Sequence, residues 1–146
     1  MQRVISTAGS EYLYPIGSAT VYNPLKITFQ NLNSGPLTAQ FQPQDIGWAG
    51  PPLDDNGNEI YDRYTTGYWT LSSIPPMTSS YYDIKLNYNG FSGVDLSSRI
   101  IKRTNGGNFE LDGKNGNLTG LEIARDSLVQ GISSITTDFA IGKGRP

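Results

Sequence analysis

The one-by-one alternation of apolar and polar residues constrains the fold of this chain more than any other feature of its sequence. In residues 25–32, Leu25, Ile27 and Phe29 share one side of an extended strand, and polar residues occupy the other side. No stretch of ordinary helix length has apolar side chains at helical spacing without an intervening glycine or proline. The pattern therefore predicts an all-β chain of half-buried strands.

A second alternating segment follows the first after a short polar turn. Leu37, Ala39 and Phe41 share one side of it, while threonine and glutamine residues take the other. The Asn-Ser-Gly at 33–35 has the composition of a hairpin turn. Residues 25–42 are therefore predicted to form a β-hairpin.

Further strands follow at about the 8 to 12 residue spacing that is typical of a sandwich. Residues 121–129 fit either a short helix or an edge strand, and we favour the strand. The other predicted strands are residues 58–65, 68–74, 81–89, 98–104, 108–113 and 137–142.

Asn-Gly steps supply the turns, because both residues tolerate the positive φ that tight turns require. The clearest hairpin turn is predicted at residues 105–107, between the strands at 98–104 and 108–113. A Pro-Pro step at 75–76 ends another strand. The remaining Asn-Gly turns are predicted at Asn56-Gly57, Asn89-Gly90 and Asn115-Gly116.

The strands are joined without a long linker, so residues 1–146 are predicted to form a single domain. A chain of this length can bury a substantial core. Trp69 alternates with Leu71 and is predicted to pack inside that core. The expected fold is an all-β antiparallel β-sandwich, Ig-like or jelly-roll-like, of about 8 to 10 strands.

The residue types that are missing limit the chemistry of the chain. It contains no histidine and no cysteine, which excludes Ser-His-Asp and Cys-His nucleophilic sites and histidine-ligated metal centres. Thirteen acidic residues still permit a glycosidase built on two carboxylates, but they are dispersed over turns and solvent-facing strand positions. We therefore expect no enzyme, no catalytic residues and no cofactor apart from a candidate calcium ion.

Charge and hydropathy limit the partners. The net charge of −2, without a basic stripe, offers nothing to neutralise phosphates, so no nucleic-acid partner is expected. No stretch approaches the ~20 apolar residues needed to span a bilayer, so no membrane insertion is expected.

Five short motifs in a fixed order cover almost the whole chain: YLYPIGSATVYNPLKITF, GPPLDDNG, GYWTL, RIIKRTNGGNFELDG and ISSITTDFAIG. Together they resemble a recurrent module of Bacteroidota surface proteins, which sits just before a type IX secretion C-terminal sorting domain. This chain departs from that pattern by stopping at Gly-Lys-Gly-Arg-Pro without a sorting tail.

The resemblance implies secretion and an extracellular or outer-cell-surface location, and it implies no catalytic residues. It favours a non-catalytic structural or adhesive module as the leading hypothesis. One alternative is a carbohydrate-binding module, with polysaccharide or another surface protein as partner. A second alternative is self-association, in which an unpaired edge strand accepts a neighbouring copy.

A cluster of side-chain oxygens between the Pro-Pro step at 51–52 and Tyr64 is the candidate calcium site. Carboxylate and amide oxygens are the ligands that calcium prefers, but the spacing departs from that of an EF-hand loop. The alternative is a plain hairpin turn between Leu53 and Ile60. The candidate ligands are Asp54, Asn56, Asn58 and Asp62.

Trp48 is the aromatic residue that strand alternation does not explain, because it lies between glycines in a loop. Exposed aromatic faces serve sugar-binding modules as platforms, and Tyr61 and Tyr64 could extend such a row. The alternative, which we favour, is that Trp48 folds back to cover one end of the sandwich.

Ser127 is a candidate glycosylation site. Asp126-Ser127-Leu128 fits the Asp-Ser/Thr-aliphatic pattern of O-glycosylation acceptors in exported Bacteroidota proteins, so this assignment depends on the resemblance.

Overall fold

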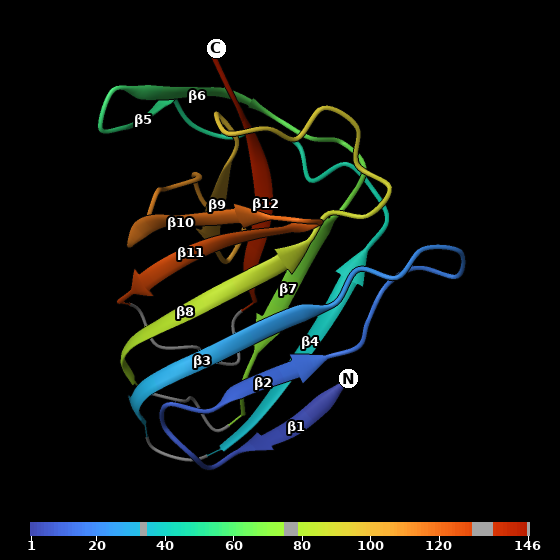
Figure 1. The fold of residues 1–146 in the computed structure, drawn as a ribbon, viewed down its shortest axis with the longest axis vertical. Coiled ribbons are helices and arrows are strands. Elements are labelled where there is room, and N and C mark those ends of the chain that lie inside the picture. Colours follow the sequence, from blue (N-terminus) through green and yellow to red (C-terminus); the bar gives the residue numbers. More distant parts are fainter. Residues whose placement is uncertain (33–34, 75–78, 130–135, 146) are drawn as a thin grey trace.

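Two antiparallel β-sheets pack face to face in the computed structural model, which describes residues 1–32, 35–74, 79–129 and 136–145 (Figure 1). Sheet A contains β1 (Gln2–Ile5), β4 (Gly35–Gln42), β5 (Leu53–Asp55), β6 (Asn58–Arg63), β7 (Tyr68–Ser72), β9 (Arg99–Thr104) and β12 (Thr137–Gly144). Sheet B contains β2 (Glu11–Tyr14), β3 (Leu25–Leu32), β8 (Ser79–Asn87), β10 (Lys114–Thr119) and β11 (Glu122–Leu128).

This arrangement confirms the predicted antiparallel β-sandwich. The described residues form twelve strands, against the expected about 8 to 10. The strands that the sequence did not reveal are β1, β2, β5 and β10, which are short or contain too few apolar residues to show alternation. Among the described residues, there is no helix long and apolar enough to cross a membrane.

The predicted hairpin over residues 25–42 is wrong. β3 pairs with β2 and β8 in sheet B, whereas β4 pairs with β1 and β7 in sheet A. The chain therefore crosses from one sheet to the other between these strands, and most of the predicted turn lies outside the described residues. Alternation had correctly identified the buried side of each strand, because Leu37 and Ala39 are fully buried like Ile27.

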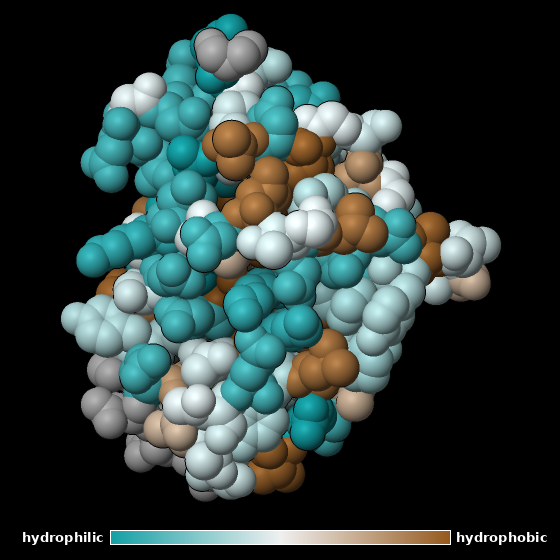
Figure 2. Space-filling model, viewed as in Figure 1, coloured by the Kyte–Doolittle hydropathy of each residue, from teal (hydrophilic) through white to brown (hydrophobic). Residues whose placement is uncertain are grey.

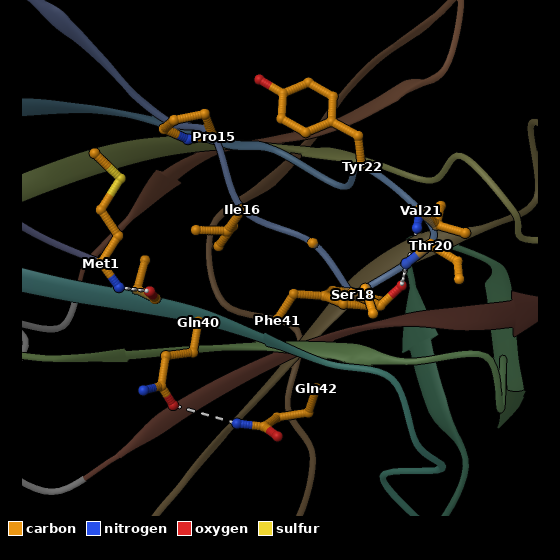
Figure 3. A pocket seen from close by; sticks show the side chains of 13 residues that line it. Met1, Pro15, Ile16, Ser18, Thr20, Val21, Tyr22, Gln40, Phe41 and Gln42 are labelled. Atoms are coloured by element: carbon orange, nitrogen blue, oxygen red, sulfur yellow. Dashed lines mark hydrogen bonds between the residues drawn. The ribbon is translucent and has the colours of Figure 1, made fainter.

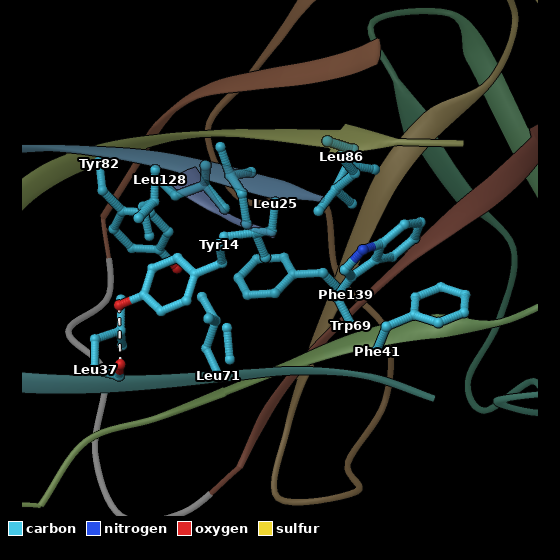
Figure 4. Packing of buried hydrophobic residues seen from close by; sticks show 14 of the residues in the cluster. Tyr14, Leu25, Leu37, Phe41, Trp69, Leu71, Tyr82, Leu86, Leu128 and Phe139 are labelled. Carbon is cyan, nitrogen blue, oxygen red and sulfur yellow. Dashed lines mark hydrogen bonds between the residues drawn. The ribbon is translucent and has the colours of Figure 1, made fainter. Parts of the chain in front are cut away.

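The main core fills the space between the two sheets (Figure 4). Trp69 is fully buried there, which confirms its predicted place, and its indole N–H donates to the Asn23 carbonyl at 3.0 Å. Phe41 meets the Trp69 ring edge-on at 5.0 Å, and Phe91 stacks on it at 5.6 Å. The buried indole thus has both apolar contacts and a hydrogen-bond partner, as a tryptophan in a core requires.

A second core covers the opposite face of sheet A. Ile60, Ile101 and Ala140 project from β6, β9 and β12, and Ile46 and Phe109 from two loops cover them. Every residue of β12 from Thr137 to Gly142 is buried, because this strand has a core on each face. β12 also pairs with β7 and β6 along one edge and with β9 along the other.

Only some of the Asn-Gly steps form the predicted turns. Asn56 and Asn105 have φ angles of 52° and 53°, as expected for turns. Asn115-Gly116 lies inside β10 at a break in its register with β11, so this predicted turn is wrong.

Two segments in the second half of the chain had uncertain or mistaken assignments. Residues 121–129 contain β11, which confirms the strand, but β11 lies between β10 and β8 and is therefore not the expected edge strand. Residues 108–113 form no strand, and their only ladder contact within the described chain is a single bridge between Lys102 and Glu110.

Candidate functional site

Trp48 is half-buried in the second core, with its ring centroid 5.4 Å from that of Phe109. Tyr61 points to the other side of β6 from Ile60, is 39% exposed and lies under the Arg145 guanidinium. Tyr64 belongs to the main core, where its hydroxyl donates to the Gly93 carbonyl at 2.6 Å.

The structure therefore does not bring these three rings into one exposed row. Only 8% of Tyr64 is exposed, so the expectation that it extends a sugar-binding platform is wrong. Trp48 folds back onto the protein, as in the favoured alternative, but it covers the outer face of sheet A and not one end of the sandwich.

The candidate calcium ligands lie on and after the β5–β6 hairpin. Asp54 accepts a hydrogen bond from the Gly57 N–H, and Asn58 donates its side-chain amide to Ser97 at 2.8 Å. Asp62 is paired with Arg63.

β5 and β6 pair directly around Asn56-Gly57, so the hairpin alternative is confirmed. Among the described residues there is no group of three or more acidic side chains placed to hold a metal ion. Calcium binding stays a prediction.

Ser127 lies in a bulge of β11 with a φ of 58°. Its N–H donates to Asp83 Oδ1 at 2.8 Å, and the residue is half-buried. The bulge fixes the backbone at the candidate glycosylation site, and glycosylation itself stays a prediction.

A cluster of charged side chains between β5, β9, β11 and the loop before β10 was not foreseen. We call it the ion cluster, and its members are Asp55, Arg99, Lys102, Glu110, Asp112 and Arg125.

Asp55 connects two arginines of the ion cluster. Its carboxylate accepts from Arg99 Nε at 2.8 Å and from Arg125 NH2 at 3.1 Å. Burial alone would raise the pKa of Asp55, but the hydrogen bonds and charges of Arg125 and Arg99 outweigh it and lower the pKa. The carboxylate is therefore a tightly held anion. It links the β5–β6 hairpin to β9 in the same sheet and to β11 in sheet B.

Arg125 is 1% exposed and connects this anion to the loop before β10. Its Nε donates to the Asp112 carbonyl at 2.6 Å, and its NH2 donates to the Gly113 carbonyl at 3.3 Å. The Asp112 carboxylate in turn contacts the ammonium of Lys102, which is also 1% exposed. Two fully buried cations are thus each matched by an acidic partner.

The outer face of sheet B carries a shallow polar groove of about 240 Å³. Hydrophilic side chains gather over the middle of this face (Figure 2). We call this depression the sheet B groove, and it is lined by Lys85, Asn117, Thr119, Glu122, Ala124 and Asp126.

Ion pairs and the β11 bulge orient the side chains of the sheet B groove. Lys85 pairs with Glu11 at 3.0 Å, and Glu122 pairs with Lys26 at 2.9 Å, a hydrogen bond that raises the pKa of Lys26. Partial burial raises the pKa of Asp126, and the neighbouring charge of Asp83 adds to this effect. Asp126 is therefore a carboxyl group that would gain from a hydrogen-bond donor.

A larger groove, of about 690 Å³, runs between the loop 15–22 and residues 39–42 of β4 (Figure 3). We call it the β4 groove. Met1 and Ala39 exchange two backbone hydrogen bonds of 2.8 Å at its closed end. Because alternate residues of a strand present their N–H and C=O groups to the same edge, those of Phe41 point to the same edge as those of Ala39.

β1 pairs with residues 35–38 of β4, and among the described residues only β7 pairs with β4 at Phe41. The Phe41 backbone groups therefore face the β4 groove. The short alternating segment at 37–42 revealed which side chains are buried, but no sequence signal showed which strands lie beside it.

Comparisons with protein-family models, with curated proteins and with solved structures find no match to this chain.

Proposed function

We propose that the chain is a non-catalytic structural and adhesive module of a bacterial surface or secreted protein, acting outside the cell. We further propose that it adheres to polysaccharide, which it binds in the sheet B groove. The observation that carries this proposal is the groove itself, a depression lined by a mixture of hydrogen-bond donors and acceptors.

The chemistry of the lining fits a polyhydroxylated ligand. The Asn117 amide and the Thr119 hydroxyl both donate and accept, Lys85 donates, and the carboxylates of Glu122 and Asp126 accept. Sugar hydroxyls also act as both donor and acceptor. A polyhydroxylated ligand therefore matches this mixed lining better than a ligand with a single charged group does.

Asp126 supports this choice of ligand. Its raised pKa reflects burial and the Asp83 charge, and a donated hydroxyl from a sugar would relieve both effects. Asp83 is already engaged by the Ser127 N–H. We therefore propose that Asp126 accepts a hydrogen bond from a ligand hydroxyl. We also propose that Asp126 and Asp83 do not hydrolyse the bound polysaccharide.

Affinity electrophoresis through gels that contain hydroxyethyl cellulose, xylan or glucomannan tests the proposal. The double variant Asn117→Ala/Thr119→Ala should weaken retention about tenfold, because each lost hydrogen bond costs about 0.5–1.5 kcal/mol. Thr28→Ala, on the same face but outside the groove, is the matched control and should bind like the original chain.

Equal retention of both variants, or no retention in any gel, would contradict the sheet B groove as the binding site. Release of shorter sugars from a retained polysaccharide, lost in Asp126→Asn, would contradict the non-catalytic part of the proposal and favour a two-carboxylate glycosidase.

Self-association is a second candidate function, favoured by the open edge in the β4 groove. An unpaired strand edge can accept a strand from another copy, with main-chain hydrogen bonds supplying the affinity. Sedimentation velocity over a range of concentrations should then show dimers or longer chains of copies.

A lysine in the β4 groove should suppress this association, because charged side chains protect strand edges. Ala19→Lys places the charge in the groove, whereas Leu121→Lys places it in the β10–β11 turn as a matched control. A chain that sediments as a monomer at every concentration, or equal behaviour of the two variants, would contradict this candidate.

A further inference from the structure

Lys102, Asp112 and Glu110 form a compact triad within the ion cluster. Lys102 Nζ is in direct contact with Asp112 Oδ2, and Glu110 Oε1 lies 3.5 Å from the same nitrogen. The Lys102 side chain is 1% exposed and that of Asp112 is 10% exposed, while Glu110 reaches solvent with 48% of its side chain exposed. A buried amine and a buried carboxyl therefore meet beside a carboxylate that can exchange protons with water.

The backbone holds the three groups in this arrangement. Lys102 and Glu110 exchange two main-chain hydrogen bonds, of 3.0 and 2.7 Å, across their bridge. Arg125 Nε holds the Asp112 carbonyl at 2.6 Å, and the Val129 N–H donates to Asp112 Oδ2 at 3.1 Å. The amine and the carboxyl are thus fixed against each other by four elements of the chain.

We propose that Lys102 and Asp112 condense into an intramolecular amide cross-link, with Glu110 as the group that carries the protons. The bond would join Nζ of Lys102 to Cγ of Asp112. It would close the loop between them and fasten β9 of sheet A to the segment that leads into β10 of sheet B.

The reaction needs no reagent from outside. The Lys102 ammonium gives a proton to Glu110, and the neutral nitrogen attacks Cγ of Asp112. One carboxyl oxygen of Asp112 then leaves as water with the two protons lost from the nitrogen, delivered through Glu110, which ends as the carboxylate it was at the start. A C–N bond forms, a C–O bond breaks, and no group is oxidised or reduced.

Burial supplies the driving force. An ion pair taken out of water keeps a desolvation cost of several kcal/mol per ion, whereas a neutral amide at the same place does not. Reactive groups that are held in contact also react as if at very high concentration. The condensation removes one cation and one anion, so the charge balance of the ion cluster is unchanged.

Burial limits the access of water to the reacting atoms, because the Lys102 side chain is 1% exposed and that of Asp112 is 10% exposed. The buried phenol of Tyr82 lies close enough to Asp112 and Glu110 for their charges to add to the burial that raises its pKa. Low exposure protects the amide product from hydrolysis.

Intact-mass measurement of the folded, purified chain after denaturation tests the proposal. The expected mass is lower than that of the sequence by one water molecule. Fragmentation should place the linkage between peptides that contain Lys102 and Asp112. A chain at the full sequence mass would overturn the proposal.

Variants separate the cross-link from other losses of water. Asp112 precedes Gly113, so a cyclic imide between these two residues would also remove one water molecule. The imide would still form in Lys102→Arg, whereas the cross-link would not. Loss of water in Lys102→Arg therefore indicates the imide. Asp112→Asn should release ammonia and reach the same final mass as the cross-linked original chain.

Two further variants complete the design. Glu110→Gln should remain at its own full mass, and a loss of water in this variant would overturn the role of Glu110. Lys85→Arg, which changes an exposed lysine, is the matched control and should still lose water. All these masses are independent of polysaccharide binding, so this proposal and the proposed function fail separately.

Discussion

Replacement of Asp55 by asparagine is the sharpest test of the ion cluster as a structural element. Asparagine has almost the same shape but carries no charge, so Arg99 and Arg125 lose their shared anion without a change in packing volume. The guanidinium of Arg125 is 1% exposed and would remain as a buried cation with neutral acceptors only, the amide oxygen of the introduced asparagine and the carbonyls of Asp112 and Gly113, in place of the Asp55 anion.

The magnitude follows from burial. Removal of one partner from a buried ion pair costs about 3–5 kcal/mol, because the other charge stays buried without compensation. Asp55 and Arg99 each keep 13% side-chain exposure, so water can reach part of the site and we expect the lower end, about 3 kcal/mol. In a chain of this size, that loss lowers the melting temperature by roughly 6–12 °C.

Urea unfolding at neutral pH, followed by circular dichroism, measures the change in the free energy of unfolding. Asp54→Asn is the matched control, since the neighbouring carboxylate is exposed and accepts only from the Gly57 N–H in the same turn. We expect the control to lose about 1 kcal/mol or less. If Asp55→Asn costs no more than Asp54→Asn, the ion cluster does not stabilise the fold in the way argued above.

The same pair of proteins gives a test by pH. The pKa of Asp55 is lowered from 3.8, so its contribution to stability is complete above pH 3.8 and is lost as the pH falls through the folded-state pKa. The difference in unfolding free energy between the original chain and Asp55→Asn should therefore be constant near neutrality and shrink below pH 3.8. A difference that persists undiminished in strong acid would refute the assignment of the stability to the ionised carboxylate.

Four further outcomes are expected. Two backbone N–H groups donate to the Tyr12 hydroxyl and lower its pKa to about 8, so ultraviolet titration should show one phenolate forming near that pH, absent in Tyr12→Phe. This depressed pKa should add stability as the pH rises from about 8 towards 10, which pH-dependent urea unfolding would detect. Ser127→Gly should stabilise by about 0.5–1 kcal/mol, since glycine removes left-handed strain at a φ of 58° while costing some backbone entropy. Gly142→Ala should destabilise by about 1–3 kcal/mol in urea, because an added Cβ would lie 2.5 Å from the Ile60 side chain. Calcium binding at Asp54 and its neighbours predicts a higher melting temperature on adding calcium, reversed by chelator, and an unchanged melting temperature would favour the plain hairpin turn.

The alternation of apolar and polar residues correctly predicted which side of each strand is buried, but it did not predict which strands pair with each other. Leu25 and Leu37 are both fully buried, as their strands indicated, yet they lie in opposite sheets. A period of two residues reports which side of a strand faces the core, but it does not report which strand lies beside it. The short turn between the two segments favoured a hairpin, whereas β3 and β4 belong to different sheets.

The ion cluster was missed although a signal for part of it was present. Lys102 lies two residues after Ile100, and Arg125 lies two residues after Ile123, so alternation places both cations on buried faces. Their acidic partners come from the end of the three-residue strand β5 and from the loop before β10, which are too short or too irregular to show periodicity. Only the folded chain shows that these charges meet, because each partner lies on a different element.

The binding surfaces were likewise beyond local sequence patterns. Trp48 drew attention as a loop aromatic, but its ring contacts Phe109, which is distant in sequence. The sheet B groove is assembled from three strands, and its members, such as Asn117 and Thr119, are ordinary surface residues when read singly.

The place of β12 has a consequence for the order of events when the chain is made. Thr137–Gly144 follows every other described strand in the sequence, yet it is the centre of sheet A and contributes to the cores on both of its faces. Until it emerges, β6, β7 and β9 lack the strand that they all pair with. Sheet A therefore cannot reach the arrangement described above until Thr137–Gly144 has been synthesised, because three strands take their register from it.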